Sequence, residues 1–256
     1  SKSFWLASKG KESLLGKFDS YYQDTLLINL KSNKNGLEKK DLAFLDLLQA
    51  NNWERPIYFN NTSLNGIGLE LKRNVIQEGF AYRLLPILSP NSGSLIDSEK
   101  MYNNLMSNSF WRGLDDEKAY FSEDHRGFIM NYRSTFNTLI KELINKKEYD
   151  KALEVINKSL DLIPDKAIMY DHFSVQIVEY LINLNEKAGM KTLELANNIA
   201  EISSKRADEI LNYYYDNNIN NRYEIQRNLV SLNTLARAYS RNSDQELSKK
   251  YRELFE

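Results

Sequence analysis

The second half of the chain contains almost no residues that break a helix. From Glu123 to the C-terminus there is one proline, Pro164, and there are two glycines, Gly127 and Gly189. Apolar residues recur there at spacings of three and four, which is the period of a helix with one buried face. We therefore predict an almost continuous series of helices over this half of the chain.

Residues 133–166 have the length and spacing of one tetratricopeptide repeat. The first predicted helix is lined by Phe136, Leu139, Ile140 and Leu143, residues 145–148 form the turn, Ala152, Ile156 and Ser159 line the second helix, and Pro164 ends it. A single helical hairpin cannot bury both of its apolar faces, so it needs neighbours. Residues 168–185 with 192–217, and 223–241 with 244–255, are predicted to be two longer, less regular pairs. Ser243 and Glu246 open the last helix in capping-box spacing.

The first part of the chain carries mixed signals. Residues 25–30, 56–59 and 80–88 are predicted strands, and residues 39–50 have helical spacing of apolar side chains. The turn formers of residues 89–94 favour a boundary there, after which Asp97 caps a short helix ending at Met106 and residues 108–120 are irregular. We predict an α+β fold that is predominantly α, with a small α/β region over residues 1–94 and a tetratricopeptide-like domain of antiparallel helical hairpins over residues 95–256.

Composition excludes several classes of function. The chain has 34 Lys and Arg residues and 35 Asp and Glu residues, so it has no net positive charge that would attract it to nucleic acid. The absence of cysteine removes thiolate chemistry, and only His125 and His172 could serve as an imidazole base or ligand. The longest apolar runs, such as residues 84–88, are far shorter than the roughly 20 residues that span a bilayer. Without an initiator Met or a signal segment, the chain is expected to be a fragment of a longer protein.

Three groups of residues were candidates for chemistry, and each also has a structural explanation. Residues 53–59 (WERPIYF) would suit a carbohydrate or peptide platform, but such aromatics usually pack in a core. Glu78 and Arg83 would form either a carboxylate clamp or an ordinary ion pair, and we favour the ion pair. The acidic group Asp115, Asp116, Glu117, Glu123 and Asp124 with His125 fits no calcium loop, so a solvated loop is favoured over a cation site.

Five segments in order carry a family resemblance: residues 52–59 (NWERPIYF), 79–87 (GFAYRLLPI), 101–102 (MY), 110–116 (FWRGLDD) and 131–133 (NYR). Together with the helical hairpins that follow, they resemble the C-terminal region of large bacterial membrane proteins related to the vertebrate transmembrane protein 260, grouped as glycosyltransferase family 117.

That resemblance implies a parent protein with an N-terminal bundle of GT-C-type membrane helices that transfers a sugar, with mannose expected, from a lipid-linked donor to proteins. It implies a periplasmic location, on the outer side of the inner membrane, and contact with the membrane only through helices absent here. The acidic base of such enzymes lies among those helices, so no residue here inherits a catalytic, cofactor-binding or metal-binding role.

The leading hypothesis is a non-catalytic accessory domain that packs on its membrane-embedded catalytic part and positions an acceptor polypeptide. We expect aromatic and arginine anchors for protein binding, and the candidates are Tyr170, Tyr180, Tyr213, Arg222 and Arg237. One alternative is a self-contained carbohydrate-active enzyme, which would need convergent carboxylates such as Glu54, Glu78, Asp115 and Asp116. Another is a structural cap without a ligand.

Overall fold

The computed structural model describes residues 3–107, 111–241 and 245–254. These residues form two compact units, Ser1–Leu105 and Met106–Glu256. The division falls after Leu105 and not near the turn-rich segment 89–94, because the segment after that turn still belongs to the first unit. There, β6 (Leu95–Ile96) pairs with β4 (Val75–Gln77), and α3 (Ser98–Met106) follows directly.

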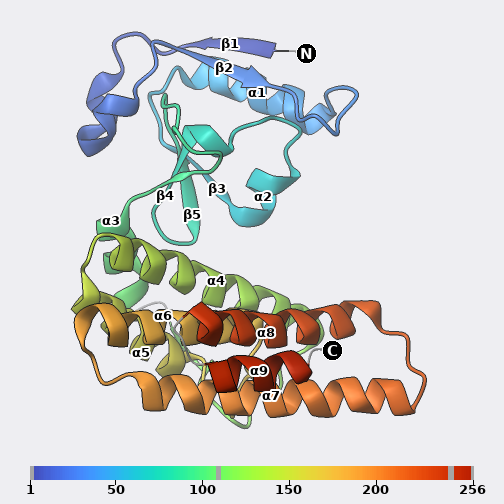
Figure 1. Ribbon diagram of the computed structural model, residues 1–256. Coiled ribbons are helices and arrows are strands. Elements are labelled where there is room, and N and C mark those ends of the chain that lie inside the picture. Colours follow the sequence, from blue (N-terminus) through green and yellow to red (C-terminus); the bar gives the residue numbers. More distant parts are fainter. Residues whose placement is uncertain (1–2, 108–110, 242–244, 255–256) are drawn as a thin grey trace. The chain divides into compact units, whose positions relative to one another are not determined.

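The first unit contains two small sheets (Figure 1). The antiparallel pair β1 (Ser3–Ala7) and β2 (Thr25–Asn29) forms one sheet, and the other has the order β3-β5-β4-β6, with β3 at Ile57–Asn60 and β5 at Ala81–Leu84. Short 3₁₀ helices occupy Glu12–Leu14, Gly16–Tyr21 and Lys72–Asn74. The predicted strand over residues 80–88 is shorter than expected, because Pro86 has no N–H to donate and Ile87 forms only an isolated bridge with Tyr22.

Two helices complete the first unit, α1 (Lys39–Asn51) and α2 (Asn61–Gly66). Leu48 of α1 is buried, and Phe44 and Leu45 pack on the same core, whereas Leu42 and Leu47 are exposed. Asp41, also on α1, is fully buried and accepts hydrogen bonds from the N–H groups of Gly68 and Glu38, at 2.7 and 2.9 Å. This carboxylate therefore ties the start of α1 to the segment after α2.

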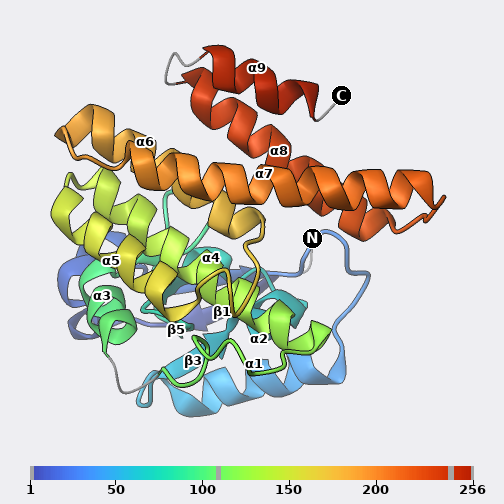
Figure 2. The ribbon, with the colours of Figure 1, turned by 90° about the horizontal axis from the view of Figure 1, so that it is seen from below.

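The second unit is helical, as predicted from the spacing of its apolar residues. Its helices are α4 (Glu123–Asn145), α5 (Tyr149–Leu162), α6 (His172–Ala188), α7 (Leu193–Asp216), α8 (Arg222–Arg241) and α9 (Gln245–Glu253). Helix α4 packs on α5 and α6, α6 packs on α7 and α8, and α8 packs on α9 (Figure 2). The predicted cap residue Ser243 lies outside the described residues.

The helical hairpin predicted over residues 133–166 is present as α4 and α5. Phe136, Leu139, Ile140, Ala152 and Ile156 are all fully buried. Helix α5 ends at Leu162, immediately before Ile163 and Pro164, and small residues lie where helices touch, including the buried Ser159. The apolar stripes of α4 and α5 thus face each other and the neighbouring helices, and not water.

Candidate functional site

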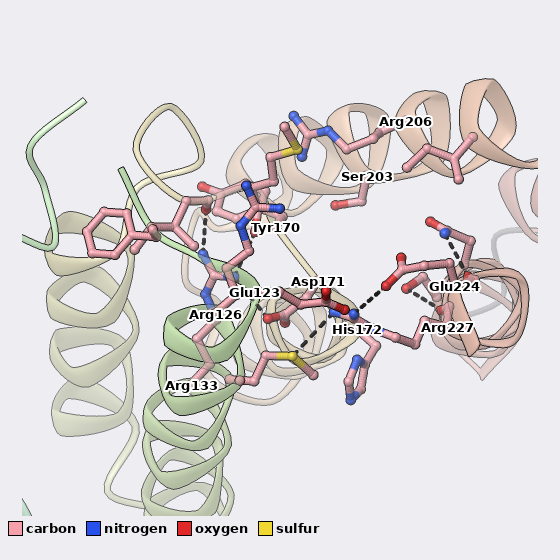
Figure 3. A pocket seen from close by; sticks show the side chains of 18 of the residues that line it. Glu123, Arg126, Arg133, Tyr170, Asp171, His172, Ser203, Arg206, Glu224 and Arg227 are labelled. Atoms are coloured by element: carbon pink, nitrogen blue, oxygen red, sulfur yellow. Dashed lines mark hydrogen bonds and ion pairs between the residues drawn. The ribbon is translucent and has the colours of Figure 1, made fainter. Parts of the chain in front are cut away.

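A pocket of about 540 Å³ lies within the second unit, among α4, α6, α7, α8 and the loop that joins α5 to α6 (Figure 3). Its lining combines aromatic and sulfur-containing side chains with charged ones: Phe121, Met130, Met169, Tyr170, Tyr214 and Tyr223 with Glu123, Arg126, Arg133, Lys166, Asp171, Arg206, Glu224 and Arg227. Some of these charged side chains are already bonded to other groups of the protein, and others have no such partner among the residues that the structure describes. Only the second kind is available to bind a ligand.

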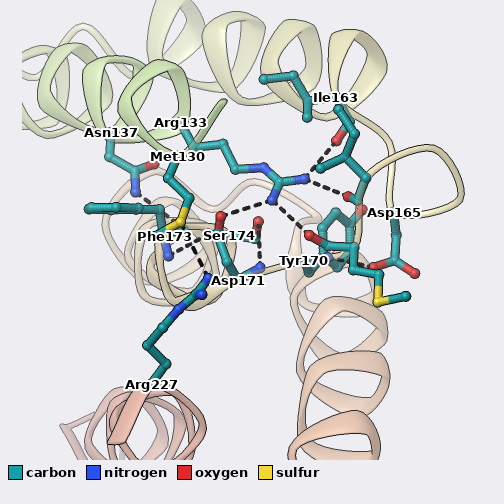
Figure 4. Close-up of polar contacts among 12 residues, drawn as sticks. Met130, Arg133, Asn137, Ile163, Asp165, Tyr170, Asp171, Phe173, Ser174 and Arg227 are labelled. Carbon is teal, nitrogen blue, oxygen red and sulfur yellow. Dashed lines mark hydrogen bonds and ion pairs between the residues drawn. The ribbon is translucent and has the colours of Figure 1, made fainter. Parts of the chain in front are cut away.

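Arg133 holds the α5–α6 loop to α4 (Figure 4). Its side chain is 3 % exposed, and Nη1 donates to the carbonyl oxygen of Met169 at 2.8 Å and to Asp171 Oδ2 at 3.0 Å. Nη2 donates to the carbonyl oxygens of Ile168 at 2.7 Å and Ile163 at 3.3 Å. A buried guanidinium with this many acceptors satisfies backbone groups that the loop cannot pair itself. Arg133 is therefore a structural element of the pocket and is not free to bind a ligand.

Arg206 of α7 is used in a similar way. Nη1 and Nη2 donate to the two carboxylate oxygens of Asp165 at 2.6 and 2.8 Å, and Asp165 also accepts the N–H of Tyr170 at 2.7 Å. Burial alone would raise the pKa of Asp165, but the hydrogen bonds from Arg206 and Tyr170 lower that pKa below its usual value. This ion pair attaches the loop to α7.

The start of α6 is capped by Asp171. Its Oδ1 accepts hydrogen bonds from the N–H groups of Phe173 at 2.8 Å and Ser174 at 3.1 Å, while the Ser174 hydroxyl accepts the N–H of Asp171. The free N–H groups of a helix start would otherwise attract an anion. Here the protein's own carboxylate occupies them.

Arg227 forms the wall on the α8 side. Its Nη1 donates to Glu224 Oε1 at 2.8 Å, its Nη2 approaches Met130 Sδ of α4 at 3.3 Å, and its guanidinium lies 5.3 Å from the centre of the Tyr223 ring. Glu224 and Arg227 therefore neutralise each other, and Arg227 spans from α8 to α4.

Several polar groups of the described lining are not used by the fold. Arg126, Lys166 and Glu123 have no ion-pair partner within the part of the chain that the structure describes. The buried atoms Ser203 Oγ and His172 Nδ1 have no hydrogen-bond partner there either. Burial lowers the pKa of His172, and Arg227 lowers it further against the opposing effect of Asp171. These surroundings thus favour the neutral form of His172 over the protonated form.

The structure distributes the five predicted anchor residues widely. Tyr170 lines the pocket, 5.8 Å from the Arg133 guanidinium. Tyr180 is partly buried on α6, where burial and, to a smaller extent, Glu179 raise its pKa to about 12. Tyr213 on α7 and Arg222 and Arg237 on α8 are exposed and do not line the pocket. Whether any of these residues binds protein remains a prediction.

Apart from Tyr170, the residues that build the pocket were not predicted as a binding site from the sequence, although the sequence contains one signal for Arg133. Arg133 lies in the same helical stripe as Ile129, Phe136 and Ile140, all of which are buried. A charged residue in an apolar stripe must find partners inside the fold. No comparable signal marks Ser203, because a small polar residue at a helix contact is ordinary.

The candidate residues of the first unit, 53–59 and the pair Glu78 and Arg83, do not line this pocket. Trp53 and Phe59 are core residues, as the structural explanation expected, whereas Tyr58 is half exposed. Glu78 is buried next to Lys100, at 3.0 Å, and Arg83, at 3.9 Å, so it belongs to an ion-pair cluster of the first unit.

The carboxylates that a carbohydrate-active enzyme would need do not form a site. Glu54, Asp115 and Asp116 are exposed, and no three acidic or histidine side chains among the described residues converge as metal ligands would. No helix in the described ranges has the length and apolar character needed to cross a bilayer.

Comparison with known families gives one match. Residues 11–105 match the family model of TMEM260-associated domain 2, and this range ends at the same residue as the first compact unit. No curated protein and no solved structure matches the chain. The helical second unit is thus outside the matched range. The N-terminal part of this chain, residues 11–105, is related to the TMEM260 family.

Proposed function

We propose that this chain is a non-catalytic accessory domain of a membrane glycosyltransferase, in which the second unit holds a segment of the acceptor polypeptide. The relation of residues 11–105 to the TMEM260 family supports the parent architecture. In this proposal the domain lies on the periplasmic side of the inner membrane and packs on its membrane-embedded catalytic part. The sugar, expected to be mannose, is transferred there and not in this chain.

The observation that carries the proposal is the rim of the pocket. Tyr120, Met169 and Tyr223 all line it, and they are 86, 58 and 61 % exposed. Large apolar side chains exposed around a concave polar surface are typical of protein-binding sites, where aromatic residues and arginine supply most of the affinity. A polypeptide would cover these side chains and place polar groups over Arg126.

The state of the pocket carboxylates argues against the carbohydrate-active enzyme. Such an enzyme needs two carboxyl groups that are free to exchange protons or attack the sugar. Asp171 is occupied by Arg133 and by the N-terminus of α6, and Glu224 is paired with Arg227. Glu123 alone is left without an ion pair among the described acids that line the pocket.

The proposal is tested with the whole 256-residue chain and a fluorescein-labelled pool of random 12-residue peptides, by fluorescence anisotropy. Tyr223→Ala removes an aromatic side chain from the rim, and Tyr215→Ala removes a more exposed tyrosine that does not line the pocket. We expect Tyr223→Ala to weaken binding roughly 5- to 30-fold, since a truncated anchor costs about 1–2 kcal/mol. Tyr215→Ala should have little effect. Absence of any binding by the pool, or equal effects of the two changes, contradicts the proposal.

A further inference from the structure

We propose that the pocket contains a carboxylate subsite, formed by Arg126, Lys166 and the hydroxyl of Ser203, which selects polypeptide segments with an Asp or Glu side chain. The inference rests on the proposed function and deepens it by naming the chemistry that the pocket recognises. The fold already uses some charged groups of the lining and leaves others without a partner among the described residues.

Three of the five cations that line the pocket are already neutralised. Arg133 is bonded to Asp171 and three carbonyl oxygens, Arg206 to both oxygens of Asp165, and Arg227 to Glu224. Arg126 and Lys166 are left, and the described lining opposes them with one free acid, Glu123. The pocket thus has one positive charge in excess that no contact of the fold uses.

Ser203 gives independent evidence for a ligand. It is 6 % exposed, its Oγ has no partner, and Figure 3 shows it entering the pocket from α7, on the side facing α4. Two other buried serines of the second unit bond back onto their own helix: Ser204 donates to the carbonyl oxygen of Glu201, and Ser231 to that of Arg227. Ser203 does not. A buried hydroxyl without a partner is unfavourable unless a ligand supplies an acceptor.

The free polar groups of the pocket suit a monoanion better than a phosphate. A dianionic phosphate is usually held by several backbone N–H groups at a helix start, together with cations. Asp171 already occupies those groups at the start of α6. One guanidinium, one ammonium and one hydroxyl, opposed by Glu123, match the charge and the few acceptor sites of a carboxylate.

The surroundings of the subsite favour a side chain of a polypeptide as the source of the carboxylate. Met130, Met169 and Ile210 line the same pocket, and Tyr223 stands at its rim. An apolar side chain next to the acidic one would cover these residues. The expected recognition element is therefore an acidic residue beside an apolar one in an extended segment.

The experiment uses the full chain and labelled 12-residue peptides that are acetylated and amidated, with Leu beside a central Glu, Gln or phosphoserine. A further Gln peptide keeps its free C-terminus. We expect the Glu peptide to bind at least about 10-fold more tightly than the capped Gln peptide, and added salt to reduce the difference. Arg126→Gln and Lys166→Gln should each reduce the preference to about 2- to 3-fold, whereas Arg112→Gln, an exposed arginine outside the pocket, should not.

Serine variants separate the subsite from general packing. Ser203→Ala should weaken binding of the Glu peptide several-fold and leave binding of the Gln peptide unchanged, without loss of thermal stability. Ser204→Ala, another buried serine of α7, should leave the preference intact.

Several results would overturn the inference. They are equal binding of the Glu and Gln peptides, tighter binding of phosphoserine than of Glu, or equal binding of the Glu peptide and the Gln peptide with a free C-terminus. If the Glu and Gln peptides bind equally and Tyr223→Ala weakens both, the proposed function stands and the carboxylate subsite is excluded. If no peptide binds, the proposed function itself fails.

Discussion

Arg206 and Asp165 form a two-point ion pair, with Nη1–Oδ1 and Nη2–Oδ2 distances of 2.6 and 2.8 Å, between α7 and the loop after α5. The two side chains are 25 and 19 % exposed, so water screens the pair only in part. Because this loop supplies Lys166, Met169 and Tyr170 to the pocket, the ion pair also fixes one wall of the binding site.

We expect Arg206→Met and Asp165→Asn to be coupled. In a double-mutant cycle measured by urea unfolding, the coupling energy should be about 0.5–3 kcal/mol, the range for residues in direct contact. Lys205→Met, at an exposed neighbouring position on α7, serves as the control for Arg206→Met and should show no coupling with Asp165→Asn. Additive effects of the Arg206 and Asp165 changes would contradict the role given to this pair.

The same carboxylate should contribute to acid unfolding. The folded protein lowers the pKa of Asp165, so its stabilisation is complete above the unfolded-state pKa of about 3.9 and is lost as the pH falls through the lowered folded-state pKa. Asp165→Asn should therefore be less stable near neutral pH and lose less stability between pH 5 and pH 2. The measurement is the free energy of unfolding against pH, and parallel curves would rule out this contribution.

Arg133→Met should be strongly destabilising. It leaves Asp171 and the carbonyl oxygens of Ile163, Ile168 and Met169 without their donor, and breaking a buried ion pair on one side costs about 3–5 kcal/mol. Arg237→Met, on the exposed surface of α8, should change stability by no more than about 0.5 kcal/mol. Urea unfolding followed by circular dichroism compares the two. A loss at Arg133 as small as that at Arg237 would show that the loop does not depend on this side chain.

His172 should contribute to the loss of stability in mild acid. Burial lowers the pKa of His172 in the folded state, so the unfolded state binds a proton first as the pH falls below about 6.5. Stability is therefore lost as the pH falls from the unfolded-state pKa toward the folded-state pKa. His172→Gln should remove this part of the loss between pH 7.5 and pH 5. His125→Gln, at an exposed position, should retain it.

Two glycines near α2 form a matched pair. A Cβ on Gly68 would lie 2.6 Å from Asp41 Oδ2, an atom held by a buried hydrogen-bond network, so Gly68→Ala should cost about 1–3 kcal/mol. A Cβ on Gly66 would meet no atom within 4 Å, and Gly66→Ala should change stability by less than about 1 kcal/mol. Thermal unfolding of both variants tests the comparison, and equal melting temperatures would contradict it.

The helical half of the fold was predictable because its signal is local. In α4 and α5 the 3.6-residue period places Phe136, Ile140 and Ile156 on buried faces, and Pro164 limits the second helix, so neighbours in sequence carry the information. Strands β1, β4 and β6 were missed. β4 is a buried run of three residues and β6 has two, which is too short for any alternation to appear, and their pairing depends on distant segments.

The candidate site was predictable only in small part. Of the five predicted anchors, Tyr170 alone lines the pocket. The pocket depends on contacts between residues far apart in sequence, such as Arg133 with Asp171 and Arg206 with Asp165. Composition and spacing do not reveal which basic residue pairs with which acidic one. They also do not reveal that Arg126 and Lys166 have no ion-pair partner among the described residues.

The bonds of Arg133 have a practical consequence for genetics. Arg133, together with the Arg206–Asp165 ion pair, holds a loop that has no regular structure, so the shape of the pocket depends on the folding of the helices around it. A random-mutagenesis screen for lost recognition would mix two kinds of variant. Changes at Arg133, Asp165 or Asp171 should lower the amount of folded protein, whereas changes at Arg126 or Lys166 should leave abundance normal and alter only what is bound.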